Sequence, residues 1–461
     1  MTSINKDISF FFNPKSIAVV GASPIAEKLS NVIINSLRDI GFTGDIYPVN
    51  PKYKSIDEMK CYQSAKAIKA DVDVAIICVP ASAVLGVMED IVAKKVKGVI
   101  IVSAGFKETG KDGAEAEEEL KKISNETGIR IIGPNCLGIF DNISKVDTFF
   151  ILRERAKRPP AGGLSILSQS GSFAGTIMDE LSAEGLGVAR IINYGNRADV
   201  GESDCLEYMA EDKSTKVVGL YIESVDNGKI FIEAARRCSA KKPVFAIKAG
   251  RQETGASAAR SHTGAIAGRY EIYSAAFKKA GIIEVKGYSE FLDACKVLSK
   301  QYHADGKRVL IVTDGGGMGA SIADACSDFG LVVAEPSQGI KDALASKLPP
   351  FCAVGNPIDL TGSVTNDNYV MALKEAMSEY DAAIVMVLWG PPLLTDGLIK
   401  MLKAASVGIK KPVIICSPGG EYSQKRKKMF EEAGLPVFSS PEEAVRAAAI
   451  LAKMTVIKLM Y

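Results

Sequence analysis

The chain has 461 residues, which is enough for about three domains of ordinary size. Hydrophobic residues make up 47% of it, and 56 Lys and Arg nearly balance 54 Asp and Glu. This composition is typical of a globular protein and argues against binding to nucleic acid or a membrane surface through bulk charge. No stretch approaches the ~20 consecutive apolar residues of a membrane span, and the nine scattered cysteines lack metal-ligand spacing. We therefore expect a cytoplasmic protein without a metal site.

The first block of the sequence predicts a parallel sheet wrapped by helices. Five apolar runs end in small or turn residues, in the order SIAVVGAS, DIYPVNP, DVDVAIICVP, VKGVIIVSAG and IRIIGPN. Amphipathic segments between them, at about 27–40, 83–95 and 112–127, predict helices. Strands and helices alternating in this way indicate a doubly wound, Rossmann-like domain, which we place at residues 1–145.

Two further blocks follow a similar plan. After the linker RERAKRPPAGG, strands are expected at LSILSQSG, VARIINYGN, VVGLYIES and PVFAIKAG, within a domain at residues 146–301. After a second linker, HADGK, strands are expected at VLIVTDGGGMG, LVVAEP, AAIVMVLWG and PVIICSPGG, within a domain at residues 302–461. Because both blocks place a glycine-rich turn between a strand and a helix, they predict two flavodoxin-like domains in a chain of the α/β class.

The turns of the first block suit a phosphorylated adenosine ligand. The turn after the first strand consists of Gly21, Ala22 and Ser23. It offers a tight turn and backbone N–H groups at a helix start, as a pyrophosphate requires, although the glycine alone also fits a plain turn. The second strand ends in Asn50, Pro51 and Lys52, and the third in Val79, Pro80 and Ala81. An NAD site needs a carboxylate after the second strand, whereas Lys52 at this position suits a ribose phosphate. The small residues after the third strand leave room for a pantetheine arm.

The fifth strand ends in the segment Gly133–Gly138, which places Asn135 and Cys136 between two glycines. The amide of Asn135 is suited to hold a thioester or carboxylate. Cys136 is not favoured as a nucleophile, because no histidine lies near it in the sequence to activate its thiol.

Two strand-to-helix loops have the composition of anion sites. The first contains Ser170, Gly171 and Ser172. Its hydroxyls and N–H groups at a helix start favour an anion site over a serine nucleophile, because the glycine that precedes the serine in the G-x-S-x-G pattern is replaced by Ser168. The third block repeats the arrangement with Gly315, Gly316 and Gly317.

A stretch of small residues from 248 to 268 surrounds His262. Such a composition predicts a mobile loop, and a lone loop histidine is more often solvated than functional. Here, however, hydroxyls, free amides, Arg251 and Arg260 surround the imidazole, and all of them favour a phosphoryl group. Glu223, at the end of the strand VVGLYIE, is a candidate to accept the other imidazole N–H, although a solvated strand-end carboxylate is the plain alternative.

The motifs Gly133-Pro-Asn-Cys-Leu-Gly, Ser168-Gln-Ser-Gly, Tyr221-Ile-Glu-Ser and Ser261-His-Thr-Gly occur in this order. Together they resemble the α subunit of ADP-forming acetyl-CoA synthetase, of the succinyl-CoA synthetase superfamily. The resemblance implies a CoA-binding domain followed by two ligase domains, with phosphohistidine at His262 and its stabilising carboxylate at Glu223. It also implies CoA along residues 21–23, 50–52 and 79–81, phosphate at 170–172 and 313–319, and Asn135 beside the acyl group.

No segment resembles the ATP-grasp nucleotide domain of this superfamily. The resemblance therefore implies a separate β subunit that carries most of the Mg-ADP or Mg-ATP site, in an α2β2 assembly. The implied reaction converts acetyl-CoA, ADP and phosphate into acetate, ATP and CoA through acyl phosphate and phosphohistidine. The alternatives are a CoA-responsive regulatory subunit, a lysine acetyltransferase or another acyl-CoA enzyme on this scaffold, and an NAD oxidoreductase.

Overall fold

The computed structural model describes residues 7–252, 254, 269–301 and 304–458. The chain divides into two compact units, residues 1–285 and 286–461, which are described separately. None of the helices in these ranges combines the length and apolarity that a membrane crossing requires. Short 3-10 helices lie at Ser9–Phe11 (η1), Ala65–Ala67 (η2), Lys107–Thr109 (η3) and Met377–Glu379 (η4).

The first unit begins with a five-stranded parallel sheet in the order β2-β1-β5-β6-β7. Its strands are β1 (Ser16–Val20), β2 (Asp45–Val49), β5 (Val74–Ile77), β6 (Gly98–Ile101) and β7 (Arg130–Ile132). Its helices are α1 (Leu29–Ile40), α2 (Ala81–Lys94) and α3 (Lys111–Thr127), and a small hairpin joins β3 (Ser55–Ile56) to β4 (Met59–Lys60). All four strands other than β2 are buried throughout, which explains their uninterrupted apolar sequences.

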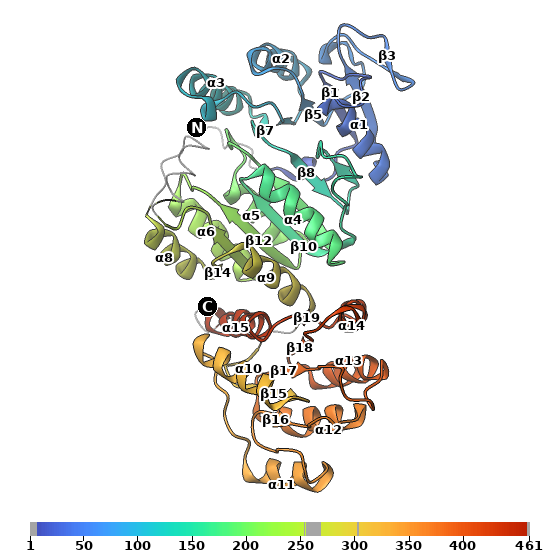
Figure 1. Ribbon diagram of the computed structural model, residues 1–461. Coiled ribbons are helices and arrows are strands. Elements are labelled where there is room, and N and C mark those ends of the chain that lie inside the picture. The colour runs from blue at the N-terminus through green and yellow to red at the C-terminus, as the bar shows by residue number, and fades with distance from the viewer. Residues whose placement is uncertain (1–6, 253, 255–268, 302–303, 459–461) are drawn as a thin grey trace. The chain divides into compact units, whose positions relative to one another are not determined.

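The same unit contains a second sheet in the order β14-β13-β12-β10-β11-β8-β9 (Figure 1). Its parallel strands are β10 (Ala161–Ser168), β11 (Val188–Asn193), β12 (Val217–Ile222), β13 (Val244–Lys248) and β14 (Ile283–Val285). The antiparallel strands β8 (Gly138–Asp141) and β9 (Val146–Asp147) extend the sheet beyond β11. The helices of this part are α4 (Gly171–Ala183), α5 (Glu202–Glu211), α6 (Gly228–Ser239) and α8 (Tyr270–Ala280).

The second unit holds a sheet in the order β16-β15-β17-β18-β19. Its strands are β15 (Val309–Thr313), β16 (Ile358–Asp359), β17 (Ala382–Met386), β18 (Val413–Cys416) and β19 (Val437–Phe438), all parallel. Its helices are α9 (Tyr288–Lys300), α10 (Gly316–Asp328), α11 (Gln338–Lys347), α12 (Asn366–Ala376), α13 (Gly397–Ile409), α14 (Glu421–Glu432) and α15 (Pro441–Lys458). Helices α10 and α15 pack together, as do α12 and α13, and the two pairs cover opposite faces of the sheet (Figure 1).

The predicted α/β class is confirmed, with a doubly wound first sheet and flavodoxin-like second and third sheets. In all three, the parallel strands numbered along the chain lie in the order 2-1-3-4-5. The expected strand LVVAEP is wrong: this segment makes only an isolated bridge between Arg308 and Val332. Val332 is 47% exposed, the carbonyl of Ala334 accepts from the side chains of Asn356 and Tyr380, and Pro336 has no N–H to donate, so the segment lacks the backbone groups for a ladder.

The domain boundaries at 145 and 301 stay predictions. The strands of the second sheet begin at Gly138, before the first boundary, because β8 pairs with β11. Helix α9 packs on α15 through an ion pair between Asp293 and Arg446, so it belongs to the second compact unit although it precedes residue 301.

The first and second sheets are joined through the loop after β11. Backbone N–H groups of Asn196, Ala198 and Val200 donate to carbonyls of the β7 strand and the segment that follows it, at 2.8–2.9 Å. Arg130, at the start of β7, forms a two-point ion pair with Asp199 at 2.8 Å and 3.1 Å. A Cβ atom at position 195, where the backbone φ is +54°, would overlap the carbonyl oxygens of Pro134 and Asn135, so this junction requires glycine.

We expect Gly195→Ala to destabilise the first unit more than Gly185→Ala. Gly185 has a similar φ of +64° and open space around its missing side chain, so its alanine variant carries only the left-handed backbone cost of about 1–2 kcal/mol. Gly195→Ala adds overpacking, typically about 1–3 kcal/mol more. Thermal unfolding of both variants measures the difference. Equal losses would show that the junction yields without strain.

Candidate functional site

A cavity of about 900 Å³ lies at the carboxyl end of the first sheet, where the chain leaves β1 and β5 in different directions. Seven of the nine residues predicted to hold CoA line it: Gly21, Ser23, Asn50, Pro51, Lys52, Val79 and Pro80. The other two do not. Ala22 is fully buried, and Ala81 begins helix α2.

The shape of this cavity depends on a glycine turn and one amide side chain. The backbone at Gly21 has a φ of +84°, and a Cβ atom there would lie 2.7 Å from the carbonyl oxygen of Cys78. The side-chain amide of Asn50 donates to the carbonyl of Ala22 at 2.8 Å, and its oxygen accepts from the N–H of Lys52 at 2.9 Å. Asn50 thus fixes the two strand ends relative to each other.

Several residues of this cavity were missed by the sequence analysis. Lys28 supplies a second cation, and Ile25 and Leu29 are apolar side chains that are 49% and 44% exposed. These three residues belong to the loop and helix that follow Gly21. They lie beyond the strand ends that the turn pattern marks, and the apolar Ile25 and Leu29 on either side of polar residues 27 and 28 are the sequence signal for them.

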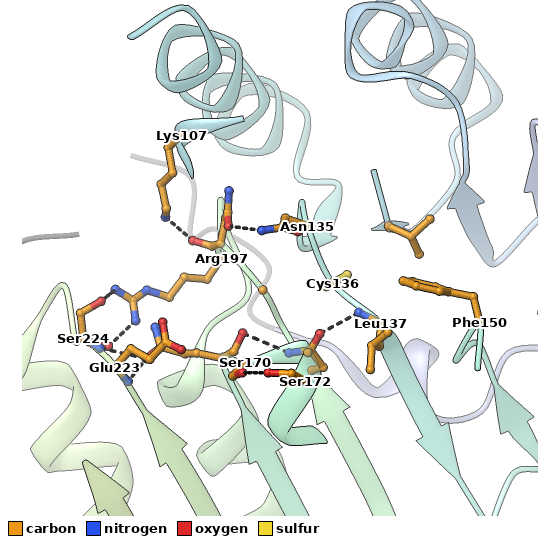
Figure 2. A pocket seen from close by; sticks show the side chains of 16 residues that line it. Lys107, Asn135, Cys136, Leu137, Phe150, Ser170, Ser172, Arg197, Glu223 and Ser224 are labelled. Atoms are coloured by element: carbon orange, nitrogen blue, oxygen red, sulfur yellow. Dashed lines mark hydrogen bonds between the residues drawn. The ribbon is translucent and has the colours of Figure 1, made fainter. Parts of the chain in front are cut away.

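A second, smaller cavity of about 250 Å³ lies at the carboxyl end of the second sheet. It brings together the five predicted residues Asn135, Ser170, Gly171, Ser172 and Glu223. Figure 2 shows that Lys107, Arg197, Glu223 and Ser224 lie at one end, whereas Cys136, Leu137 and Phe150 lie at the other. The cavity therefore has a polar end and an apolar end.

The loop between β10 and α4 borders this cavity. The hydroxyl of Ser168 accepts from the N–H of Ser170 at 3.1 Å, and Ser170 caps helix α4 by accepting from the N–H of Phe173. The first N–H groups of a helix have no partner within the helix and carry its positive dipole end. A Cβ atom at Gly171 would make only ordinary contacts with protein, at 3.5 Å or more, so the glycine keeps space open in the cavity.

Gln169 connects this loop to the strand that carries Glu223. Its side-chain oxygen accepts hydrogen bonds from the backbone N–H groups of Glu223 and Ser224, the latter at 2.9 Å. The backbone N–H of Gln169 donates to the carbonyl of Tyr221 at 3.3 Å. Glu223 is 9% exposed, so its carboxyl group is held at the cavity by backbone that is fixed on both sides.

Arg197 and Lys107 provide the cations at the polar end. The guanidinium of Arg197 donates to the carbonyl and hydroxyl of Ser224 and pairs with Asp226 at 2.5 Å. Although burial opposes its charge, the carboxylates of Glu202 and Asp226 hold the pKa of Arg197 above its ordinary value. Lys107 donates to the carbonyl of Asn196 and pairs with Glu117 at 2.8 Å. Neither cation has a local sequence signal, because both reach the cavity only through the junction between the sheets.

Cys136 is a packing residue. Its side chain is buried, and the thiol lies 3.3 Å from the carbonyl oxygen of Ile101. Burial raises the pKa of the Cys136 thiol, which keeps it protonated and a poor nucleophile, as the sequence indicated.

The second unit repeats the loop geometry of the second sheet. Thr313 accepts from the N–H of Gly315 at 3.0 Å, as Ser168 does from Ser170. The carboxylate of Asp314 accepts from the N–H of Leu388 at 3.1 Å, beyond the end of β17, and burial raises its pKa. Gly315 is the N-cap of α10, and Gly316 and Gly317 begin the helix. His262 lies outside the described residues, so its predicted role stays a prediction.

Three domain families match the chain in succession. Residues 15–142 match a CoA-binding domain, residues 161–298 a succinyl-CoA ligase-like flavodoxin domain, and residues 309–456 a ligase-CoA domain. The chain therefore has the fold and domain order of a CoA-binding, succinyl-CoA ligase-like protein.

Relatives that align along nearly the whole chain identify the family within this class. The α subunit of ADP-forming acetate–CoA ligase II from Pyrococcus furiosus is 36% identical over 96% of this chain and 97% of its own length. ADP-forming acetate–CoA ligase I from Archaeoglobus fulgidus is 37% identical over 96% of this chain, which spans only 63% of that protein. The solved dinucleotide-forming acetyl-coenzyme A synthetase 1 of Ca. Korarchaeum cryptofilum has a TM-score of 0.92 and 33% identity, with 98% of both chains covered. The chain belongs to the family of ADP-forming acetate–CoA ligases.

We expect Gln169→Met to lower the stability of the first unit by about 2 kcal/mol or more. The thioether cannot replace the amide oxygen, so two largely buried N–H groups lose their acceptor, each at a cost of about 1–3 kcal/mol. Chemical denaturation measures the loss. Gln338→Met is the matched control, because that side chain is exposed and its loss costs about 0.5 kcal/mol at most. Similar losses in both variants would contradict the bridging role of Gln169.

Proposed function

We propose that this chain is the α subunit of an acid–thiol ligase that converts acetyl-CoA, ADP and phosphate into acetate, ATP and CoA. The observation that carries the proposal is that Val102, at the end of β6, lines both cavities of the first unit. The large cavity is suited to CoA and the small one to phosphate, so their shared wall puts a thioester beside a bound anion.

The residues of the large cavity fit CoA. The N–H groups of Gly21 and Ala22 both donate to the carbonyl of Val49, so the turn shapes the cavity and does not itself offer these groups to a pyrophosphate. Lys28 and Lys52 are the cations for phosphate groups. The apolar walls at Val79 and Pro80 suit a pantetheine arm that runs toward Val102. CoA supplies the thiol that carries the acyl group.

The first chemical step takes place in the small cavity. A phosphate oxygen attacks the thioester carbonyl carbon, the C–S bond breaks, and CoA leaves as a thiolate that takes up a proton. The N-terminus of α4, with Ser170 and Ser172, holds the phosphate, and Asn135 lies where it can donate to the carbonyl oxygen. The product is an acyl phosphate, and the charge at phosphorus is stabilised by the helix dipole.

The second step transfers the phosphoryl group to His262. An imidazole nitrogen attacks phosphorus, the bond to the acyl oxygen breaks, and acetate leaves. Glu223 accepts the other imidazole N–H and so fixes the tautomer. The buried position of Glu223 at the cavity supports this role.

The last step is completed on a partner. We propose that an ATP-grasp β subunit, in an α2β2 assembly, holds most of the Mg-ADP site, where a β-phosphate oxygen takes the phosphoryl group from His262. The P. furiosus relative is named as an α subunit, and the K. cryptofilum relative was solved with phosphate and ADP. All nine cysteines are free, as a reducing cytoplasmic setting allows.

The alternative is a CoA-binding regulatory subunit or another acyl-CoA enzyme on this scaffold. Such a protein needs the large cavity alone. It has no use for an anion site whose cations and helix N-terminus converge beside the thioester position.

We expect the chain, incubated with acetyl-CoA and labelled phosphate, to acquire label that is stable in base and labile in acid, as phosphohistidine is. His262→Ala should abolish it. His303→Ala is the matched control, because His303 is the only other histidine of the chain, and its label should match wild type. Glu223→Gln should lower the yield or lifetime of the phosphoenzyme about tenfold or more. Label that persists in His262→Ala would remove the carrier from the mechanism.

We also expect Lys52→Ala to weaken CoA binding about tenfold and to leave binding of dephospho-CoA within about twofold. The two ligands differ only in the ribose 3′-phosphate, which Lys52 is proposed to contact. Lys54→Ala is the control, since this exposed lysine lies outside the cavity lining. Calorimetric titration measures all affinities. An equal loss for both ligands would show that Lys52 does not contact the 3′-phosphate.

A further inference from the structure

The small cavity separates charge from hydrocarbon along its length. Its polar end carries Lys107, Arg197 and Glu223, whereas Cys136, Leu137 and Phe150 form its apolar end (Figure 2). The start of helix α4 lies between the two ends, with Gly171 beside Leu137. Within the described lining residues, no charged side chain lies at this apolar end. A phosphate belongs at the start of α4, on the side of Lys107 and Arg197, because burial of an anion requires partners.

The thioester enters between these two ends. Val102 is common to both cavities, so a pantetheine arm in the large cavity reaches the small one there. The carbonyl carbon carries sulfur, oxygen and the acyl chain. With phosphate at the start of α4, sulfur at Val102 and the carbonyl oxygen toward Asn135, the acyl chain points to the apolar end.

The apolar end has a fixed size. Val102, Cys136 and Leu137 are 4–7% exposed and belong to the packed interior. The N–H of Leu137 donates to the side-chain oxygen of Asn193 at 2.7 Å, and Asn193 also donates to the carbonyl of Ser168 at 2.9 Å. One buried amide therefore sets the distance between this wall and the phosphate loop.

Phe150 closes the remaining side. It is half-buried, and the backbone on both sides of it is held by Arg158, which donates to the carbonyls of Phe149 at 3.4 Å and Ile151 at 2.9 Å. Arg158 is itself fixed by an ion pair with the buried Asp147 at 2.8 Å. The ring is thus a wall with limited freedom to move.

We propose that Phe150, backed by Leu137 and Val102, sets the length of the acyl chain that the enzyme accepts and restricts it to short, uncharged aliphatic groups. This inference rests on the proposed function. A longer chain meets the Phe150 ring. A dicarboxylate substrate would place its second charge against Leu137 and Phe150 without a partner, which is costly.

The test is the binding of two ligands, acetyl-CoA and butyryl-CoA, to the full-length chain by calorimetric titration. Phe150→Ala should raise the affinity for butyryl-CoA relative to acetyl-CoA about tenfold or more, because each methylene accommodated in an apolar pocket is worth about that factor. Phe150→Leu should give a smaller change in the same direction. Both variants should bind free CoA as wild type does.

Phe42→Ala is the matched control, because Phe42 is a half-buried phenylalanine of the same unit that lies outside both cavity linings. It should keep the wild-type ratio. An unchanged ratio in both Phe150 variants, with normal CoA binding, would overturn the inference. Phosphate-dependent release of CoA from acetyl-CoA tests the proposed function separately: its absence with the β subunit present refutes that function, whereas the affinity ratio still decides the role of Phe150.

Discussion

The strand order within each sheet determines where this protein can bind ligands. In a sheet of order 2-1-3-4-5, the chain leaves the first and third strands in opposite directions, so a crevice opens beyond their carboxyl ends. The first sheet has Gly21 and Val79 at this place, and the second has Ser170 and Glu223. The third, in its own unit, has the loop at Gly315. Each candidate site follows from the topology, and the side chains decide which ligand it suits.

The loops after the first strands of the second and third sheets are fixed by similar hydrogen bonds. Gln169 follows the first strand of its sheet and accepts the N–H groups beyond the end of the third strand. Asp314 occupies the corresponding place in the second unit and accepts the N–H of Leu388. In both loops a hydroxyl two residues before the helix cap shapes the turn. Because these side chains satisfy backbone groups, the helix N-termini remain available to an anion.

Features that depend on neighbouring residues could be predicted from the sequence, and features that depend on distant ones could not. Hydrophobic period, segment length and turn residues predicted the α/β class and most strands, and Ser170–Ser172, predicted as an anion site, line the small cavity. The segment LVVAEP failed because Val332 is exposed and two side chains distant in sequence, Asn356 and Tyr380, donate to the carbonyl of Ala334 in place of a neighbouring strand. Lys107, Arg197 and Phe150 lie far apart in sequence and meet only in the folded chain.

The separation of polar and apolar ends within one small cavity has a chemical consequence for the proposed reaction. Water and phosphate are competing nucleophiles for a thioester, and attack by water would lose the energy of the thioester bond. An apolar wall at Val102, Leu137 and Phe150 leaves little room for water beside the acyl group, whereas the N-terminus of α4, which begins next to Leu137, favours an anion there. The side chain of Asn193 bonds to Leu137 on the apolar wall and to the carbonyls of Ser168 and Gln169 in the phosphate loop, so the wall and the loop stay at a constant distance. The hydrogen bonds of Asn193 thus also favour phosphate over water as the nucleophile in the proposed reaction.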